Sequence, residues 1–260
     1  AEYFFPSPRL GVLLVPTEDV TAKLLYGRAF RAPTVRELLV EVQPDDDGFY
    51  AFTQGNLALE PEKIDTAEGE VAWRLASPVT LRGAAFASLL SEFIDKSIER
   101  DQYTNRGSAL VVGGEAEVLV EAGPVDAAVS YAVTRGTTDD KRVYEFPPHM
   151  AHGRLTWSPV DRFHVTGMAD WYGVRPRSEW SPDAGLSDGS PFGLLHVAVA
   201  TDTLSDRLRV DLSVRNILDT PHQTLVYIDD ANAVSGDAAK YPNDIDGEGR
   251  MFIVGLEADL

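Results

Sequence analysis

Apolar and polar residues alternate with a period of two along most of this chain, which is the spacing of the two faces of a β-strand. The clearest alternation sets Val125, Ala127, Val129, Tyr131 and Val133 against Asp126, Ala128, Ser130, Ala132 and Thr134. Residues 194–201 are apolar on both sides, so the pattern does not assign their faces. With this run included, the pattern predicts about 11 strands: 10–14, 20–30, 66–75, 79–93, 108–121, 125–134, 150–157, 163–172, 194–201, 208–215 and 252–260.

The connections between these runs are short and long in strict alternation. Short reversals follow Pro16 and lie at Ser77-Pro78, Gly123-Pro124 and Pro159–Asp161. The longer, polar connections are residues 33–64, 95–106, 135–149, 175–191 and 218–249. An all-β, antiparallel, up-and-down transmembrane barrel has this order, with short periplasmic turns and long extracellular loops. On this count, the last strand ends on the periplasmic side.

Aromatic residues give a second indication of a membrane barrel. Trp73 and Trp157 lie next to short turns, and another group lies near the long connections, namely Tyr26, Phe30, Phe93 and Trp171. All six belong to the apolar face, as expected for two aromatic belts at the lipid interfaces. The same alternation places His152 and Arg154 inward and places Ala151, Leu155 and Trp157 outward.

Two motifs flank the first long connection. The first reads YG-x-AFRAP-x-x-x-EL and comprises Tyr26, Gly27, Ala29, Phe30, Arg31, Ala32, Pro33, Glu37 and Leu38. The second reads GN-x-x-L-x-PE and comprises Gly55, Asn56, Leu59, Pro61 and Glu62. Further along lie an NRG-x(6)-GGE run at Asn105–Glu115 and a VRNILD run at Val214–Asp219. These four landmarks, in this order, resemble the C-terminal half of TonB-dependent outer-membrane receptors.

The resemblance implies a fold and a function. It implies a 22-stranded barrel plugged by an N-terminal domain, which imports scarce nutrients such as ferric siderophores or cobalamin with energy relayed from the inner membrane. The chain has 260 residues, so we expect residues 1–260 to form about half of such a barrel, without the plug domain and without the region that contacts TonB. Chains of this membrane usually end in an aromatic residue, whereas this one ends in Leu260.

Composition narrows the choice of partners. The net charge of −18 argues against nucleic acids and anionic membrane surfaces, since both call for clustered Lys and Arg. The 44% hydrophobic content and the absence of a long apolar run exclude only a helical membrane span. The absence of cysteine fits an exported protein without disulfides, and equally a chain that lacks cysteine for other reasons. The expected partners are outer-membrane lipid, a small-molecule or metal-chelate ligand and TonB.

Catalytic and metal-binding patterns are weak. The five histidines, His149, His152, His164, His196 and His222, show no zinc-ligand spacing, and no nucleophile or phosphate-binding motif occurs. Acidic groups at Asp45–Asp47, Asp229-Asp230 and Asp244–Asp246 lack the ligand spacing of a calcium loop, so we interpret them as solvated loop residues. The chain is therefore expected to be no enzyme and to hold no cofactor or metal.

Ligand contacts are expected in the long loops. Exposed aromatic and cationic loop residues suit the recognition of a flat or anionic ligand, and we predict this role for Tyr50, Phe52, Arg177 and Trp180. The leading hypothesis is thus the C-terminal barrel portion of a nutrient receptor in a Gram-negative outer membrane. Two alternatives stay open, namely a self-contained small barrel acting as a pore or adhesin, and a soluble β-rich binding domain.

Overall fold

One antiparallel sheet contains nearly all the regular structure. The computed structural model describes residues 6–40, 54–97, 102–138, 141–142, 147–176, 188–204, 208–225 and 245–258. Its sheet has 12 strands, which follow one another in the order β1-β2-β3-β4-β5-β6-β8-β9-β10-β11-β14, with β7 paired only to β6. Each strand in the path pairs with its neighbour in sequence order, so the predicted up-and-down meander is confirmed.

The sheet strands are β1 (Arg9–Thr17), β2 (Val20–Arg31), β3 (Glu62–Ala76), β4 (Val79–Ser97), β5 (Gln102–Ala122), β6 (Val125–Thr138), β7 (Lys141–Arg142), β8 (His149–Val160), β9 (Phe163–Tyr172), β10 (Phe192–Leu204), β11 (Leu208–Arg215) and β14 (Met251–Ala258). A separate two-stranded sheet pairs β12 (Gln223–Thr224) with β13 (Ile245–Asp246). The five-residue helix α1 (Val35–Leu39) lies in the first long connection.

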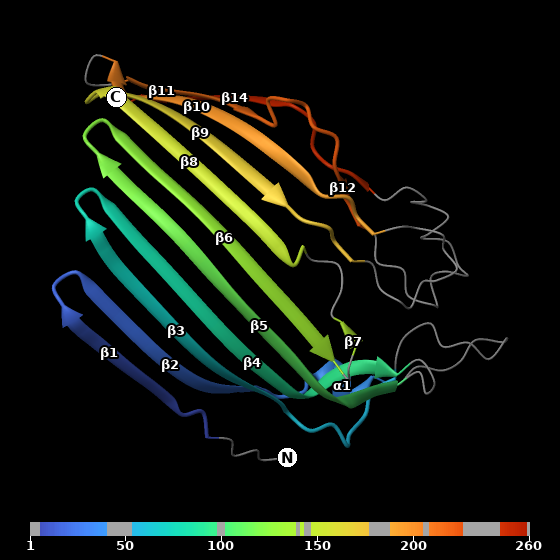
Figure 1. Ribbon diagram of the computed structural model, residues 1–260. Coiled ribbons are helices and arrows are strands. Elements are labelled where there is room, and N and C mark those ends of the chain that lie inside the picture. Colours follow the sequence, from blue (N-terminus) through green and yellow to red (C-terminus); the bar gives the residue numbers. More distant parts are fainter. Residues whose placement is uncertain are drawn as a thin grey trace.

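Short and long connections lie at opposite ends of the sheet. Figure 1 shows the tight reversals gathered at one end, among them those between β1 and β2, β3 and β4, and β5 and β6. The long connections start and finish at the other end, where β12 and α1 also lie. This end is called the rim below.

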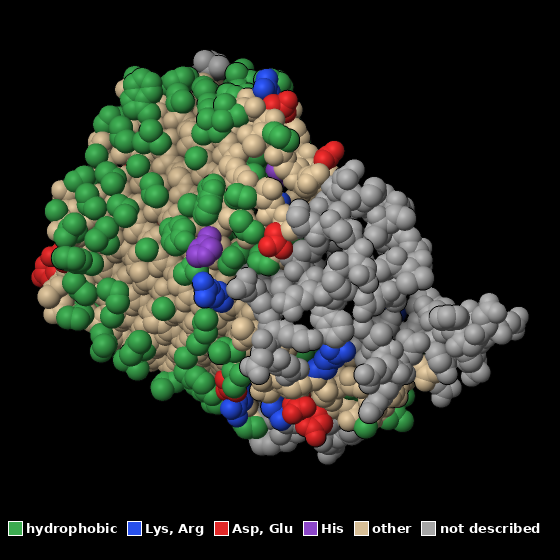
Figure 2. All heavy atoms as spheres, turned by 45° about the vertical axis from the view of Figure 1, so that its right-hand side comes forward, with side chains coloured by type: hydrophobic (Ala, Val, Ile, Leu, Met, Phe, Trp, Pro, Cys, Tyr) green, Lys and Arg blue, Asp and Glu red, His purple; other side chains and the backbone are tan. Residues whose placement is uncertain are grey.

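One face of the sheet is apolar and exposed. Its residues include Val129, Tyr131 and Phe252, whose exposed fractions are 59%, 45% and 72%. Ser130 is paired across the sheet with Glu117 and with His152, so these three share the opposite, polar face. Figure 2 shows one side of the molecule as a rounded surface on which hydrophobic side chains predominate. The predicted separation of Val125, Ala127, Val129, Tyr131 and Val133 from Asp126, Ser130 and Thr134 is therefore confirmed.

Side chains packed away from solvent are few in this fold. Within the described residues, Leu59 is the single buried residue of the hydrophobic core, at 3% exposure. The side chain of Pro61 is fully buried. Both lie near the rim and outside the middle of the sheet. A sheet normally buries its apolar face against a second layer, and an exposed apolar patch of this extent marks an interaction surface. The apolar face is therefore expected to contact an apolar environment.

The register settles two points that the pattern left open or misplaced. Val199 of β10 pairs with Val165 and Leu212, which assigns Leu195, Val197 and Val199 to the apolar face. Residues 95–106 were predicted to be a connection, but Asp95 pairs with Thr104 and Ser97 with Gln102. That prediction was wrong because the backbone ladder continues beyond the point at which the apolar and polar alternation of the sequence ends.

The two ends of the strand order are β1 and β14. Each has one neighbour within the described part of the chain, β2 for β1 and β11 for β14. Within the described residues the two edges are not hydrogen-bonded to each other, as predicted for an open segment of a larger barrel.

In the described ranges, no helix is long and apolar enough to cross a membrane.

The lipid exposure of the apolar face can be tested with single cysteines, because the chain contains none. A spin label on Val129→Cys should be relaxed mainly by lipid-soluble oxygen, and one on Ser130→Cys mainly by a water-soluble nickel complex, because adjacent strand residues point to opposite faces. Power-saturation EPR of the complete protein in lipid vesicles measures this. Equal accessibility of both labels to nickel would contradict the two-faced arrangement.

Candidate functional site

The first motif forms an ion-pair network at the rim. Arg31, the last residue of β2, pairs with Glu37 of α1 at 3.0 Å and with Glu62, the first residue of β3. Thr34 caps the helix: its Oγ1 accepts the Glu37 N–H at 3.2 Å, and Glu37 Oε2 accepts the Thr34 N–H at 2.6 Å. This reciprocal capping box starts a helix of only five residues directly after Pro33. The network explains why the motif has Arg31 and Glu37 six residues apart.

Glu37 is charged in this network. Burial alone would raise the pKa of its carboxyl group, but hydrogen bonds from the Arg31 guanidinium and from the Thr34 N–H outweigh burial and lower that pKa. The carboxylate is therefore held by two elements that are consecutive in the chain, the end of β2 and the start of α1.

The second motif closes the same connection. The Gly55 N–H donates to Val40 O at 2.6 Å, and the Asn56 N–H donates to Glu37 O at 2.8 Å. A Cβ at Gly55 would lie 2.7 Å from the backbone nitrogen of Val40, so this close approach requires glycine. Leu59 and Pro61 then pack out of solvent.

Two asparagines join this connection to the next one along the sheet. Asn56 Nδ2 donates to Tyr103 O at 2.9 Å. Asn105 Nδ2 donates to Glu60 O at 2.8 Å and to Glu92 O at 2.7 Å, while its Oδ1 accepts the Glu60 N–H at 2.7 Å. The side-chain amides of Asn56 and Asn105 form hydrogen bonds with backbone groups of neighbouring segments. We therefore infer that they hold the bases of the loops in place. We call the group of Arg31, Glu37, Asn56, Glu62 and Asn105 the motif anchor.

The remaining motif residues divide between the two faces of β2. Tyr26 and Phe30 are exposed on the apolar face, and Gly27 and Ala29 are on the polar face. The Tyr26 hydroxyl donates to Asp65 Oδ1 at 2.5 Å, and Arg28 pairs with the same carboxylate at 2.8 Å. Arg28 interrupted the apolar alternation in the sequence, and this ion pair accounts for it.

A second cluster lies on the polar face of β8 to β11. The Asn216 N–H donates to His196 Nδ1 at 3.1 Å, so His196 carries its proton on Nε2 and donates it to Asp170 Oδ2 at 3.0 Å. The other carboxylate oxygen of Asp170 is 2.6 Å from His152 Nδ1. Asp170 thus fixes both imidazole rings, and the ring of His152, about half exposed, faces away from the sheet.

Asn216 anchors the last long connection. Its side chain is 2% exposed and donates to Thr220 O at 3.0 Å and to Glu248 O at 3.2 Å, while its Oδ1 accepts the Thr220 N–H at 2.8 Å. Its φ of +47° is in the left-handed region, which asparagine tolerates better than most residues. Asn216 belongs to the VRNILD run, so this landmark, like the first two, holds a loop base.

Aromatic residues fill the space next to this cluster. Tyr172, Phe192 and His222 stack in sequence with centroid separations of 4.9 Å and 4.8 Å. The Arg175 guanidinium lies 5.0 Å from the Phe192 ring and donates to Ser190 O at 3.3 Å and to Gln223 O. The stack therefore connects the ends of β9 and β10 with the strand β12.

A cavity of about 390 Å³ opens beside this stack, between the rim ends of β10 and β11 and the residues after β13. We call it the rim pocket. The side chains that matter below are those of His196, Arg215, Asn216, His222, Asp246 and Glu248. The alternation did not assign a face to His196, and the pairing of Asp170 with His196 depends on register, which no short motif encodes.

Further down the polar face, ion pairs alternate with single carboxylates. Lys23 pairs with Glu70 at 3.1 Å and Arg82 with Glu117 at 3.4 Å. Glu68 and Glu115 also lie on this face and have no ion-pair partner among the described residues. Among all the residues that the structure describes, no three His, Cys, Asp or Glu side chains are arranged to hold a metal ion.

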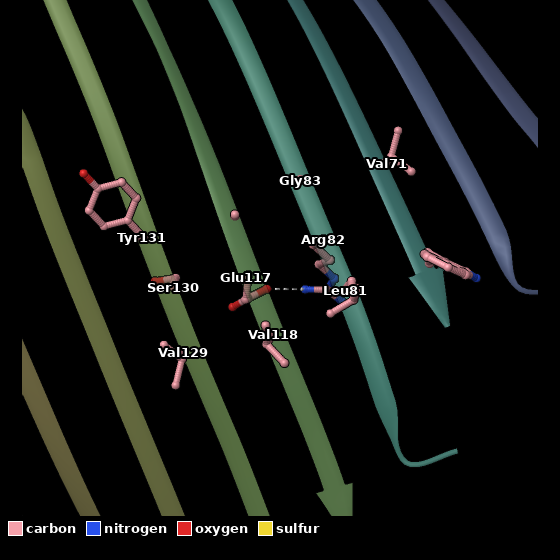
Figure 3. A pocket seen from close by; sticks show the side chains of 11 residues that line it. Val71, Leu81, Arg82, Gly83, Glu117, Val118, Val129, Ser130 and Tyr131 are labelled. Atoms are coloured by element: carbon pink, nitrogen blue, oxygen red, sulfur yellow. Dashed lines mark hydrogen bonds and ion pairs between the residues drawn. The ribbon is translucent and has the colours of Figure 1, made fainter. Parts of the chain in front are cut away.

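A hollow on the apolar face lies over β3 to β6 and measures about 480 Å³. Gly83 and Ala116 form its floor, and Val71, Leu81, Val118, Val129 and Tyr131 surround them (Figure 3). The Arg82–Glu117 ion pair drawn in the same view belongs to the polar face. This hollow follows from small residues on a surface of larger ones and contains no cluster of polar groups.

Of the predicted ligand residues, Tyr50, Phe52, Arg177 and Trp180 all lie outside the described residues. Their predicted role therefore stays a prediction.

Residues 2–217 match the family described as TonB dependent receptor-like, beta-barrel.

Three solved structures have similar folds. The ferric-catecholate import receptor Fiu from K12 E. coli has a TM-score of 0.68 at 16% identity over 96% of this chain and 34% of its own. The FrpB iron transporter from Neisseria meningitidis has a TM-score of 0.71 at 15% identity, with coverages of 97% and 39%. A mutant of the ferric enterobactin receptor PfeA from Pseudomonas aeruginosa, in complex with enterobactin, has a TM-score of 0.75 at 19% identity, with coverages of 97% and 40%. The chain thus spans well under half the length of the structures it matches.

The motif anchor predicts the effect of removing Asn105. Asn105→Ala should remove the hydrogen bonds to the Glu60 N–H and to the carbonyls of Glu60 and Glu92, each of which contributes about 0.5–1.5 kcal/mol because water can replace only part of it. Hydrogen exchange of residues 54–62 should then accelerate at least tenfold while the middle of β6 stays protected. Thr134→Ala, on the polar face of β6, is the matched control. Unchanged exchange in 54–62 would show that the anchor does not hold this segment.

Proposed function

The chain belongs to the TonB-dependent receptor-like β-barrel family, and from this premise we propose that it is the C-terminal part of an outer-membrane receptor that imports a scarce nutrient. The family consists of transport receptors, and its barrels lie in the outer membrane of Gram-negative bacteria. In the proposal, residues 1–260 supply about half of the barrel wall, and the plug domain and TonB-contacting region lie elsewhere in the complete protein. The nutrient is a ferric siderophore, cobalamin or a similar chelate.

One observation carries this proposal: an open meander of 12 strands in a single layer, with an exposed apolar face and a polar face. A soluble domain would have to bury such a face. Outer-membrane barrels instead turn it to lipid and enclose the polar face. The unpaired edges β1 and β14 favour a segment of a larger wall over a small closed pore or adhesin.

The polar face supports a filled lumen. The carboxylates of Glu68 and Glu115 face the interior without an ion-pair partner among the described residues. In the proposal, these carboxylates meet cationic groups of the plug domain, since charges facing a packed interior are normally paired. TonB acts on the plug region and not on this chain.

Nutrient recognition is proposed for the long loops. The motif anchor, Asn216 and Arg175 fix where each loop leaves the sheet, so loop residues between these points are free to acquire specificity. Tyr50 and Phe52 follow α1, and Arg177 and Trp180 follow Arg175. An aromatic ring stacked on the chelate and an arginine paired with its anionic oxygen would bind a ferric siderophore.

The loop assignment is tested in the complete protein by Arg177→Ala and Trp180→Ala. Each should weaken binding of the imported chelate at least tenfold, as expected for a central arginine or tryptophan contact, without changing heat-modifiable migration of the folded barrel. Arg36→Ala, an exposed arginine on α1, is the matched control. If affinity is unchanged while His152→Ala or Arg154→Ala abolishes it, recognition lies inside the lumen instead.

A further inference from the structure

We propose that the rim pocket binds a zwitterionic group, with Arg215 holding the anionic end and Asp246 and Glu248 holding the cationic end. This inference rests on the proposed import function, because it names the chemical class of ligand that the inner wall would select. It does not involve the loop residues discussed above.

The charges that line the pocket are available. Arg215, Asp246 and Glu248 are exposed and form no side-chain hydrogen bond or ion pair within the described part of the chain. By contrast, Arg209, six residues before Arg215 on the same face of β11, pairs with Asp211 at 3.3 Å. An arginine presents a planar fork of donors that matches a carboxylate, and carboxylates accept from an ammonium group.

The side chains of His196 and Asn216 line the pocket and already have hydrogen-bond partners other than the charged side chains of the pocket. Both ring nitrogens of His196 are engaged, one by the Asn216 N–H and one by Asp170. The Asn216 side chain is likewise used by Thr220 and Glu248 backbone groups. The neutral polar lining is therefore fixed, which lowers the entropy cost of binding a small ligand.

Glycines allow the segment after β13 to approach the wall closely. A Cβ at Gly247 would lie 2.2 Å from Nε2 of His222, and one at Gly249 would lie 3.2 Å from Oδ1 of Asp219. His222 is itself held by its stack on Phe192. The segment that carries Asp246 and Glu248 is therefore positioned against β11, which carries Arg215.

These features select the ligand class. The three side chains without an ion-pair partner among the described residues have one positive and two negative charges, so a ligand with a single charge would leave charges of one sign unpaired. The volume of about 390 Å³ lies at the lower end of the range for small-molecule sites. The pocket thus suits a compact group with both an ammonium and a carboxylate, either free or as part of a larger chelate.

The test uses the complete protein in nanodiscs and a series of straight-chain zwitterions: glycine, 4-aminobutyrate and 6-aminohexanoate. Binding is measured by saturation-transfer NMR, with the N-acetyl and methyl-ester derivatives of each compound as singly charged analogues. At least one zwitterion should bind more than fivefold tighter than both of its analogues, and the preferred chain length reports the spacing of the charges.

Variants give a crossed pattern. Arg215→Gln should weaken binding of the zwitterion and of its N-acetyl form and leave the methyl ester unchanged, whereas Asp246→Asn with Glu248→Gln should do the reverse. Arg154→Gln, an exposed arginine on the polar face of β8 outside the pocket, should change nothing. Absence of zwitterion binding, or equal loss in the Arg154→Gln control, overturns the inference.

Chelate uptake by cells that carry the complete protein separates the two proposals. Uptake without zwitterion binding would overturn the inference alone. Zwitterion binding without uptake of any chelate would overturn the import function and keep the pocket.

Discussion

A polypeptide backbone surrounded by hydrocarbon must pair its own N–H and C=O groups, because each unpaired group costs several kcal/mol there. The antiparallel meander meets this constraint for every strand that has two neighbours. At one end of the sheet consecutive strands need only reverse, and turns of two residues suffice between β1 and β2, β3 and β4, β5 and β6, and β8 and β9. The backbone groups on the outer edges of β1 and β14 do not meet the constraint, since each of these strands has one neighbour in the described sheet. In the proposed assignment, the apolar face and the open edges therefore follow from one requirement, that the sheet be continued by other strands and surrounded by lipid.

The polar chemistry of the molecule is concentrated at the rim, and most of it holds loops. Arg31 pairs with Glu37 inside the first long connection, and Asn56 and Asn105 join this connection to the ends of β4 and β5. Asn216 and Arg175 hold residues of the last two long connections. These side chains use their hydrogen-bonding groups internally, so they give the loops fixed origins without binding anything themselves. The rim pocket differs because the side chains of Arg215, Asp246 and Glu248 have no such partner among the residues that the structure describes.

The fold was largely predictable because a membrane strand carries its two faces in its own alternation. Val125 to Thr134 and the outward aromatic residues Trp73 and Trp157 needed no knowledge of neighbours. The pattern failed in two places: beyond Phe93 the strands stay paired although the alternation ends, and β10 is apolar on both sides. The candidate site was less predictable, since the contact between Asp170 and His196 depends on a register that only the assembled sheet defines. The motif residues were found by resemblance, but their role as loop anchors required the structure, and Tyr50, Phe52, Arg177 and Trp180 stay predictions.

The central claim is that β1 and β14 are continued by strands outside this sheet, and a distance between the two edges tests it most directly. Val12 and Val254 lie on the apolar faces of β1 and β14, and each can be replaced by cysteine and spin-labelled in the complete protein in lipid vesicles. Neighbouring antiparallel strands place paired Cα atoms about 4.5–5.5 Å apart. The account predicts a double electron–electron resonance distance several times larger, with a narrow distribution. A separation equal to that of neighbouring strands would mean that β1 and β14 pair with each other, and it would contradict the assignment of this chain to part of a larger wall.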